Sequence, residues 1–274
     1  MMEIETKGVR MPALGFGTWN LRGEDCRHMI GEALELGYRH LDTAQAYENE
    51  AAVGQGLADS GLARADVWIT TKLWMDSLDP QAVPRALAKS LERLRTDYVD
   101  LLLIHWPSEE VPHLETLAAM AEQRDAGRIR HLGVSNFTVE QIVEVTAGGL
   151  DPLTNQVEYH PFLSQDDLRA ALDERDMILT AYAPLARGRV AADPTIAGIA
   201  QAHGKTPEQV TLRWLLQQRN VAAIPKAGSR KHAAANIAIF DFALDEAEMS
   251  AITALGRSRQ RLIDPSWAPV WDAA

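Results

Sequence analysis

The chain has 274 residues, of which 46% are hydrophobic and 24% are charged, an ordinary globular composition with enough apolar residues for a large core. Its net charge is −11 at pH 7, so its overall field repels a phosphate backbone and argues against a nucleic-acid partner. The single cysteine, Cys26, excludes an intramolecular disulfide, and we expect it to be a buried, inert thiol.

The N-terminal five residues are acidic and lack the apolar core of a signal peptide. No apolar run in the chain approaches the ~20 residues that a membrane span requires. We therefore expect a cytoplasmic protein with no membrane partner.

The first half of the chain alternates between strand and helix patterns. A polar hairpin is predicted around Lys7-Gly8, and a first strand over residues 14–19. Helix 24–36 ends at Gly37, the usual left-handed residue after a helix, and strand 39–41 follows. Next come helix 49–60, strand 67–73 and helix 80–94, whose leucines recur with a 3.6-residue period.

The alternation continues in the second half. The predicted elements are strand 99–105, helix 114–126, strand 129–135, helix 139–146, strand 154–158, helix 165–175, strand 178–182, helices 195–203 and 207–218, strand 221–224 and helix 231–239. An extra helix over 244–255 and a tail follow. Eight strands, each followed by a helix, predict a (β/α)₈ TIM barrel better than an open sheet of five or six strands. No linker interrupts the pattern, so residues 1–274 are predicted to form a single domain.

Barrel enzymes place their active sites at the carboxyl ends of the strands. Seven of the eight predicted strands end in a polar or ionisable residue: Asp42, Lys72, His105, Ser135 with Asn136, Gln156, Tyr182 and Lys226. Tyr47 follows Asp42 by five residues, on what should be a loop. Taken alone, Asp42 and Tyr47 are equally consistent with a helix cap and a packing tyrosine.

Lys72 favours a catalytic role for Asp42 and Tyr47. An ammonium on a buried stem needs a counter-ion, for which Asp42 on the neighbouring strand is the natural candidate. An ammonium within ~4–6 Å of a phenol stabilises the phenolate and so lowers the pKa of a tyrosine. Together with His105, such a group would polarise and protonate a carbonyl oxygen. The pattern lacks the carboxylate pair of a glycosidase and the clustered ligands of a catalytic zinc, so no metal is expected.

An external hydride is the most attractive nucleophile, because no serine or cysteine stands out for that role. Gly15 and Gly17 do not form a Rossmann fingerprint, since the third glycine and the following helix are missing. Residues 225–232, after the last strand, instead place several cations and backbone amides at a helix start. That segment is suited to an anion, although a solvated basic helix start is the common alternative.

The motifs resemble the aldo-keto reductase superfamily nearly from end to end. The resemblance rests on Gly15-Phe16-Gly17-Thr18-Trp19, Leu41-Asp42-Thr43-Ala44, Thr71-Lys72-Leu73-Trp74, Leu103-Ile104-His105-Trp106-Pro107, Gly133-Val134-Ser135-Asn136-Phe137, Asn155-Gln156-Val157-Glu158-Tyr159-His160-Pro161 and Ile224-Pro225-Lys226. Within the superfamily the chain is most similar to bacterial 2,5-diketo-D-gluconate reductases, through residues 95–101 and the terminal Ala268-Pro269-x-Trp271-Asp272.

The resemblance implies a nicotinamide-dependent carbonyl reductase. Tyr47 would be the general acid, Lys72 paired with Asp42 would tune its pKa, and His105 would orient the carbonyl. Ser135, Asn136 and Gln156 would hold the nicotinamide carboxamide, and Tyr182 would stack on its ring. The other implied cofactor residues are Thr18, Leu185, Lys226, Ser229, Arg230, His232 and Asn236. The implied substrate walls are Trp19, Trp74 and Trp106.

The phosphate segment departs from the family pattern, because Ala227 and His232 stand where serine and arginine are common. An imidazole is mostly neutral at pH 7 and should hold a 2′-phosphate less firmly than a guanidinium. We therefore expect NADPH to be preferred, through Lys226 and Arg230, but NADH to be discriminated against less strictly.

Two questions stay open at this point. A non-catalytic, nucleotide-binding regulatory subunit is the alternative to an enzyme, although no partner-binding extension is evident. Aromatic walls and short loops suggest an open pocket for small polar carbonyls. The candidate substrates 2,5-diketo-D-gluconate, methylglyoxal and aromatic aldehydes all agree with such a pocket. The resemblance suggests a monomer.

Overall fold

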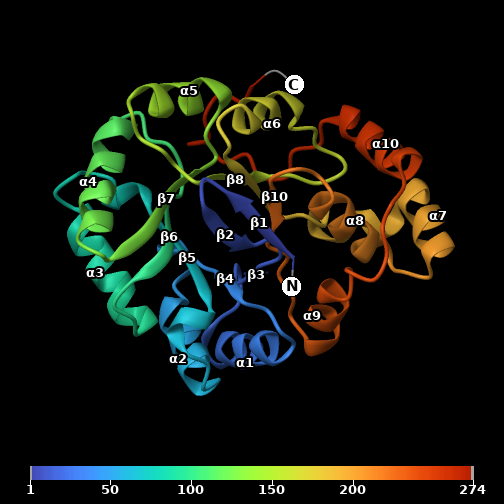
Figure 1. The fold of residues 1–274 in the computed structure, drawn as a ribbon, viewed down its shortest axis with the longest axis horizontal. Helices are drawn as coiled ribbons and strands as arrows, with labels where there is room; N and C mark the ends of the chain where they lie inside the picture. The colour runs from blue at the N-terminus through green and yellow to red at the C-terminus, as the bar shows by residue number, and fades with distance from the viewer. Residues whose placement is uncertain (1, 273–274) are drawn as a thin grey trace.

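A computed structural model describes residues 2–272, so Met1, Ala273 and Ala274 of the predicted domain lie outside the described residues. Eight parallel strands form one sheet at the centre, and the helices surround it (Figure 1). The predicted (β/α)₈ barrel is therefore confirmed. A separate antiparallel hairpin precedes it, as predicted.

The hairpin strands are β1 (Glu3–Thr6) and β2 (Val9–Pro12). The barrel strands are β3 (Phe16–Gly17), β4 (His40–Asp42), β5 (Trp68–Leu73), β6 (Val99–Ile104), β7 (Ile129–Ser135), β8 (Thr154–Glu158), β9 (Ile178–Tyr182) and β10 (Val221–Ala223). Their spatial order follows the chain from β3 to β10 without a crossover. All six residues of β6 are buried, as expected for a parallel strand covered on both faces.

The helices are α1 (Gly23–Glu35), α2 (Glu50–Asp59), α3 (Val83–Leu94), α4 (His113–Asp125), α5 (Val139–Ala147), α6 (Asp166–Asp173), α7 (Pro194–His203), α8 (Pro207–Leu216), α9 (Arg230–Ile237) and α10 (Glu246–Ala254). Short 3₁₀ segments include η1 (Gln45–Tyr47), η4 (Ala186–Ala192) and η5 (Leu255–Ser258). Thr206 caps α8 in a reciprocal arrangement with Gln209.

The barrel closes between β3 and β10. The Gly15 amide donates to Ala223 O at 2.9 Å, and the Gly17 amide donates to Pro225 O at 3.1 Å. A Cβ at Gly17 would lie 2.5 Å from Ile224 O, so only glycine permits this approach. The Gly15-x-Gly17 pair is therefore explained by backbone packing at the barrel seam.

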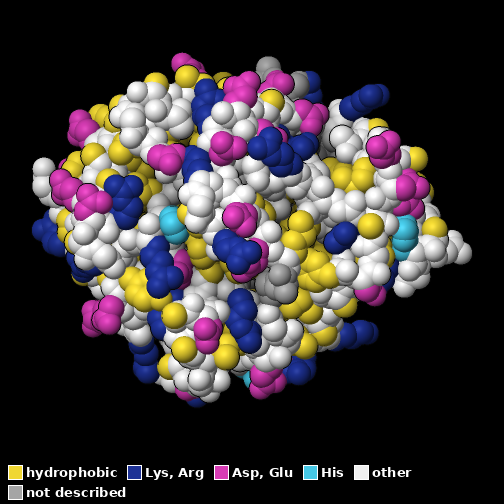
Figure 2. All heavy atoms as spheres, viewed as in Figure 1, with side chains coloured by type: hydrophobic (Ala, Val, Ile, Leu, Met, Phe, Trp, Pro, Cys, Tyr) yellow, Lys and Arg dark blue, Asp and Glu magenta, His cyan; other side chains and the backbone are white. Residues whose placement is uncertain are grey.

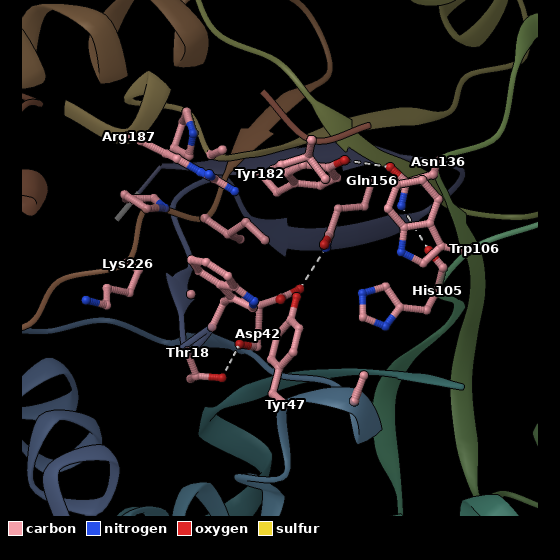
Figure 3. A pocket seen from close by; sticks show the side chains of 18 of the residues that line it. Thr18, Asp42, Tyr47, His105, Trp106, Asn136, Gln156, Tyr182, Arg187 and Lys226 are labelled. Atoms are coloured by element: carbon pink, nitrogen blue, oxygen red, sulfur yellow. Dashed lines mark hydrogen bonds between the residues drawn. The ribbon is translucent and has the colours of Figure 1, made fainter. Parts of the chain in front are cut away.

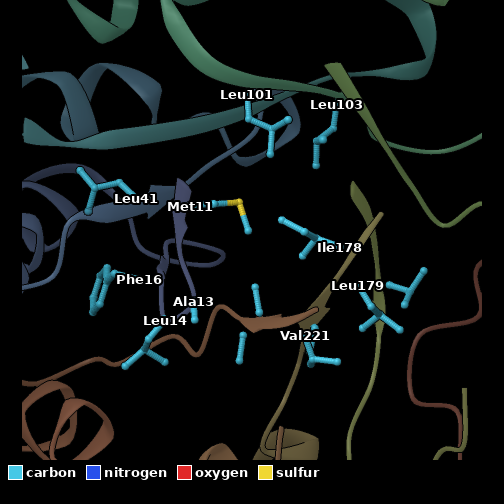
Figure 4. Packing of buried hydrophobic residues seen from close by; sticks show 14 of the residues in the cluster. Met11, Ala13, Leu14, Phe16, Leu41, Leu101, Leu103, Ile178, Leu179 and Val221 are labelled. Carbon is cyan, nitrogen blue, oxygen red and sulfur yellow. The ribbon is translucent and has the colours of Figure 1, made fainter. Parts of the chain in front are cut away.

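The hairpin covers one end of the barrel (Figure 1). From β2, Met11 is completely buried and points in among Leu41, Leu101 and Ile178 (Figure 4). This apolar plug closes the amino-terminal end of the strands. A ligand pocket must accordingly open at the opposite end, where the strands finish.

Several predicted boundaries were wrong by a few residues. The first strand, predicted over residues 14–19, is only Phe16–Gly17, because Gly15 and the residues before it pair with β10 only through isolated contacts. The helix predicted from residue 80 begins at Val83, with Pro84 in its first turn, because Asp79 holds the preceding residues in a turn. Tyr47 lies in η1 rather than in an open loop.

The face that carries the hairpin shows basic and acidic side chains interspersed (Figure 2). This distribution agrees with the composition, because the net charge of −11 is the difference between 27 basic and 38 acidic residues. Within residues 2–272, every helix is too short or too polar to cross a membrane.

Candidate active site

A pocket of about 790 Å³ opens at the carboxyl ends of the barrel strands. It is lined by Asp42 from β4, His105 after β6, Gln156 from β8, Tyr182 from β9 and Lys226 after β10, among others. Figure 3 shows Lys226 and Arg187 on one side, His105 and Trp106 on the other, and Asp42 with Tyr47 between them. The pocket thus has a cationic end and an aromatic end.

Asp42 and Lys72 form a buried ion pair at the base of this pocket. Lys72 Nζ lies 2.5 Å from Asp42 Oδ1, and the two side chains are 0% and 1% exposed. Lys72 Nζ also donates to Thr43 O at 2.9 Å. Burial lowers the pKa of Lys72, and the Asp42 charge opposes that shift. The predicted pairing of Lys72 with Asp42 across neighbouring strands is present.

Tyr47 extends from η1 toward that ion pair. Its hydroxyl oxygen lies 3.4 Å from Lys72 Nζ, which donates to it. The expected lowering of the tyrosine pKa is not found: burial, followed by the negative charge of Asp42, raises the pKa of Tyr47 well above 10. Burial is the larger cause because it disfavours the charged phenolate, and the nearby Asp42 charge adds to the shift. Tyr47 is therefore a protonated phenol at neutral pH.

His105 lies between two aromatic rings at the other side of the pocket. Its ring centroid is 5.6 Å from that of Tyr47 and 5.2 Å from that of Trp74. Burial, followed by the Lys72 charge, lowers the pKa of His105 well below 6.5. Its Nδ1 is buried without a hydrogen-bond partner among the described residues. His105 is thus a neutral imidazole held by packing.

The residues expected to hold the nicotinamide form a connected network. Tyr182 Oη donates to Asn136 Oδ1 at 2.7 Å, and Asn136 Nδ2 donates to His105 O at 2.9 Å and to Ser135 Oγ at 3.1 Å. Ser135 Oγ in turn donates to Gln156 O at 2.7 Å. The structure therefore brings Ser135, Asn136, Gln156 and Tyr182 together, as the sequence predicted.

Gln156 has an additional partner that the sequence did not reveal. Its Nε2 donates to Asp42 Oδ2 at 2.7 Å, so the side-chain amide nitrogen is already engaged (Figure 3). Its carbonyl oxygen and the second N–H of the amide are left for a ligand. Thr18 also supports this region, since its Oγ1 donates to Asp42 O at 2.9 Å.

The segment predicted to bind phosphate is only partly at the pocket. Lys226 lines it, but Ser229, Arg230, His232 and Asn236 do not. Ser229 caps α9 by accepting from the His232 amide, and Asn236 is 5% exposed. Arg230 is ion-paired with Glu32 and Glu35 of α1, both of which raise its pKa. Its guanidinium is therefore already held by two carboxylates.

The three predicted aromatic walls all line the pocket, as does Leu185. Trp106 is 6% exposed, whereas Trp19 is 55% exposed at the rim. A fourth tryptophan, Trp267 of the tail, packs edge-on against Trp74 with centroids 6.2 Å apart. Trp267 could not be placed from the sequence, because its position depends on how the tail folds back.

Sequence reasoning missed Arg187, whose guanidinium lies 5.7 Å from the Trp19 ring centroid. It belongs to η4, in the segment that follows β9, and it lines the pocket. A signal was available, since loops after the seventh and eighth barrel strands commonly bind phosphate and a cation there is a candidate ligand.

Comparison with known proteins gives one family. The profile described as Aldo/keto reductase family matches residues 13–257. The methylglyoxal reductase DkgB of Escherichia coli O157:H7 is 40% identical over 269 residues, which cover 96% of this chain and 100% of that protein.

Solved structures agree with this result. A candidate 2,5-diketo-D-gluconic acid reductase B superposes with a TM-score of 0.97 at 45% identity, covering 100% of this chain and 98% of that one. A Bombyx mori aldo-keto reductase in complex with NADP superposes with a TM-score of 0.90 at 34% identity, covering 97% of this chain and 95% of that one.

Proposed function

This chain belongs to the aldo/keto reductase family and is an oxidoreductase, and we propose that it reduces small aldehydes and ketones to alcohols with NADPH, using Tyr47 as the proton donor. The observation that carries the proposal is the Tyr47 hydroxyl, 3.4 Å from Lys72 Nζ, which is itself 2.5 Å from Asp42. A structural ion pair alone would not require a phenol beside it at the mouth of a pocket.

A bound nicotinamide cofactor supplies the hydride for this chemistry. Tyr47, with its raised pKa, remains protonated at neutral pH and donates its proton to the carbonyl oxygen. Lys72 stabilises the phenolate as it forms, because the ammonium is fixed beside the hydroxyl before reaction. Asp42 accepts from Lys72 and Gln156 and so keeps the ammonium in place.

His105 contributes as a neutral group. Its lowered pKa keeps it uncharged, so it orients the carbonyl by hydrogen bonding without supplying a competing charge. Its contacts with Tyr47 and Trp74 restrict the ring. Asp42, Tyr47, Lys72 and His105 are accordingly proposed as the catalytic set.

We propose that the pocket binds a dinucleotide. Its cationic end presents Lys226 and Arg187, which suit phosphate groups, and Thr18 and Leu185 line its sides. Ser135, Asn136, Gln156 and Tyr182 are joined by hydrogen bonds beside the proposed catalytic residues. We propose NADPH as the preferred cofactor, with Ser229, Arg230, His232 and Asn236 as further contacts near its adenosine end.

Substrates are proposed to be small polar carbonyls. Trp74 and Trp106 supply flat apolar walls on the His105 side of the pocket, and Trp19 supplies one at the rim beside Arg187. The names of similar proteins point to methylglyoxal and 2,5-diketo-D-gluconate. Aromatic aldehydes would also suit the tryptophan walls. We further propose that residues 1–274 act as one domain and as a monomer, which light scattering would test.

The loss of NADPH absorbance in the presence of methylglyoxal tests the proposal. We expect turnover by the wild-type protein and no turnover without the carbonyl. Cofactor binding without turnover on methylglyoxal, 2,5-diketo-D-gluconate or an aromatic aldehyde would contradict it and favour a nucleotide-binding subunit.

A further inference from the structure

Glu158, the last residue of β8, is a completely buried carboxylate that the proposed chemistry does not use. Its Oε1 accepts a hydrogen bond from the Leu262 amide at 2.7 Å, and its Oε2 accepts one from the Ile263 amide at 2.8 Å. Both donors belong to the C-terminal tail, more than a hundred residues away along the chain. A barrel strand thus holds the tail backbone directly.

The third donor to Glu158 is His160. The His160 Nδ1 accepts from the Phe162 amide at 3.3 Å, so the proton of the neutral ring lies on Nε2. That nitrogen lies 2.9 Å from Glu158 Oε1 and donates to it. Both side chains are 0% exposed, so these three N–H groups replace water around the carboxylate, and the Arg261 guanidinium lies close enough to interact with its charge.

The bonds to Glu158 come immediately before the part of the tail that lines the pocket. Ile263, Asp264, Pro265 and Trp267 all contribute to the pocket wall. Trp267 packs on Trp74, which packs on His105. The tail is also folded on itself, since Trp271 Nε1 donates to Asp264 at 2.8 Å and Arg261 lies 3.7 Å from the Trp271 ring centroid.

Other tail contacts lie farther from these wall residues. The Gln260 amide donates to Phe162 O at 2.7 Å, and Asp272 accepts from the Val139 amide at the start of α5. These contacts hold the two ends of the segment. Among the described contacts between the tail and the barrel, only those of Glu158 hold the backbone at Ile263, the first tail residue that lines the pocket.

We propose that Glu158 is a positioning residue that sets the substrate wall of the pocket by fixing the backbone of Leu262 and Ile263. The inference rests on the proposed carbonyl reduction. Glu158 touches neither Tyr47 nor Lys72 in any described hydrogen bond, so its effect is on substrate fit. Bulky substrates that reach Trp267 depend on it, whereas a small dicarbonyl does not.

Glu158→Gln tests this proposal. The amide keeps the size of the side chain but can accept at only one of its two ends, so at least one tail bond is replaced by two facing donors. With an aromatic aldehyde, KM should rise about tenfold with kcat nearly unchanged, the pattern of lost ground-state contacts. With methylglyoxal, both constants should stay within about twofold.

Asp100→Asn is the matched control. Asp100 is a buried carboxylate that accepts from the Ile69 amide at 2.9 Å and pairs with Arg64 and Arg130, but it does not line the pocket. Its substitution should lower Tm and leave the ratio of the two KM values unchanged. A merely structural role for Glu158 would give the same result as this control.

Three outcomes would overturn the proposal: equal KM changes for both substrates, no change for either, or the same KM split in Asp100→Asn. Leu262→Pro provides a second route if Glu158→Gln does not fold, because proline removes the N–H bound to Oε1 and leaves the pocket-lining side chains unchanged. It should produce the same KM split. Failure of wild type to reduce methylglyoxal or the aldehyde would instead refute the proposed function.

Discussion

Gln156 Nε2 donates to Asp42 Oδ2 at 2.7 Å, across the interior of the barrel from β8 to β4. Since Asp42 Oδ1 is occupied by Lys72 at 2.5 Å, both carboxylate oxygens accept from fixed nitrogen donors. The carboxylate is thereby fixed in one orientation. Asp42 is suited to hold the Lys72 ammonium in place beside Tyr47.

The proton donor assignment is tested by Tyr47→Phe. The variant keeps the ring that packs against His105 but loses the hydroxyl beside Lys72. We expect kcat to fall by about 10²–10⁴, the usual contribution of a positioned general acid. NADPH affinity, measured by fluorescence titration, should change little. Carbonyl reduction by this variant at the wild-type rate would eliminate Tyr47 from the mechanism.

The Lys72–Asp42 ion pair should also be visible in stability. Lys72→Met leaves the Asp42 charge buried with only the Gln156 amide as a close side-chain partner. The free energy of unfolding should fall by about 3–5 kcal/mol, the usual cost of an uncompensated buried charge. The double variant Asp42→Asn, Lys72→Met removes both charges and should recover much of that loss while remaining inactive.

Urea unfolding measures these differences. An equal loss of stability in Lys72→Met and in the double variant would show that the charge on Asp42 is not what makes the single substitution costly.

The pH dependence of reduction follows from two opposite pKa shifts. Tyr47 must be protonated to donate, and its pKa is raised above 10, so this group is active throughout the neutral range and is lost only at higher pH. His105 must be neutral, and its pKa is lowered below 6.5, so it is already in its active form at about pH 6. We expect kcat at saturating NADPH to be flat from about pH 6 to 9.

A decrease in kcat below about pH 7 that disappears in His105→Gln would contradict a neutral His105. The same decrease retained in that variant would have to come from another group.

Local patterns predicted the barrel and the proposed catalytic set. Strand β6 is apolar along its whole length, and Asp42, Lys72 and His105 each stand at the end of a strand, so the topology alone brings them together. Contacts between distant segments were not predictable in this way. The bond from Glu158 to Leu262 joins residues 104 apart, and no local pattern marks the tail as part of the pocket.

The pKa of Tyr47 shows a second limit of sequence reasoning. The neighbouring cation was predicted correctly, but the direction of the shift depends on burial and on the negative charge of Asp42. Arg230 is a similar case, because its pairing with two glutamates of α1 depends on the packing of α9 against α1.

Removal of the ion pairs that hold Arg230 should increase the affinity for NADPH. Glu32 and Glu35 both pair with its guanidinium, and Arg230 is 51% exposed in its side chain. The double variant Glu32→Gln, Glu35→Gln leaves the guanidinium available for a 2′-phosphate. We expect the ratio of kcat/KM for NADPH to that for NADH to rise by roughly threefold, a small effect because solvent screens exposed pairs. Glu24→Gln, on the same helix but paired with Arg27, is the control.

His232 should limit the preference for NADPH. It is exposed at the start of α9, beside Arg230. His232→Arg places a second guanidinium there, which can bind a phosphate through two N–H groups. That variant should raise the ratio of kcat/KM for NADPH to that for NADH, measured with the two cofactors and the same carbonyl substrate. An unchanged ratio in His232→Arg would exclude this position from cofactor discrimination.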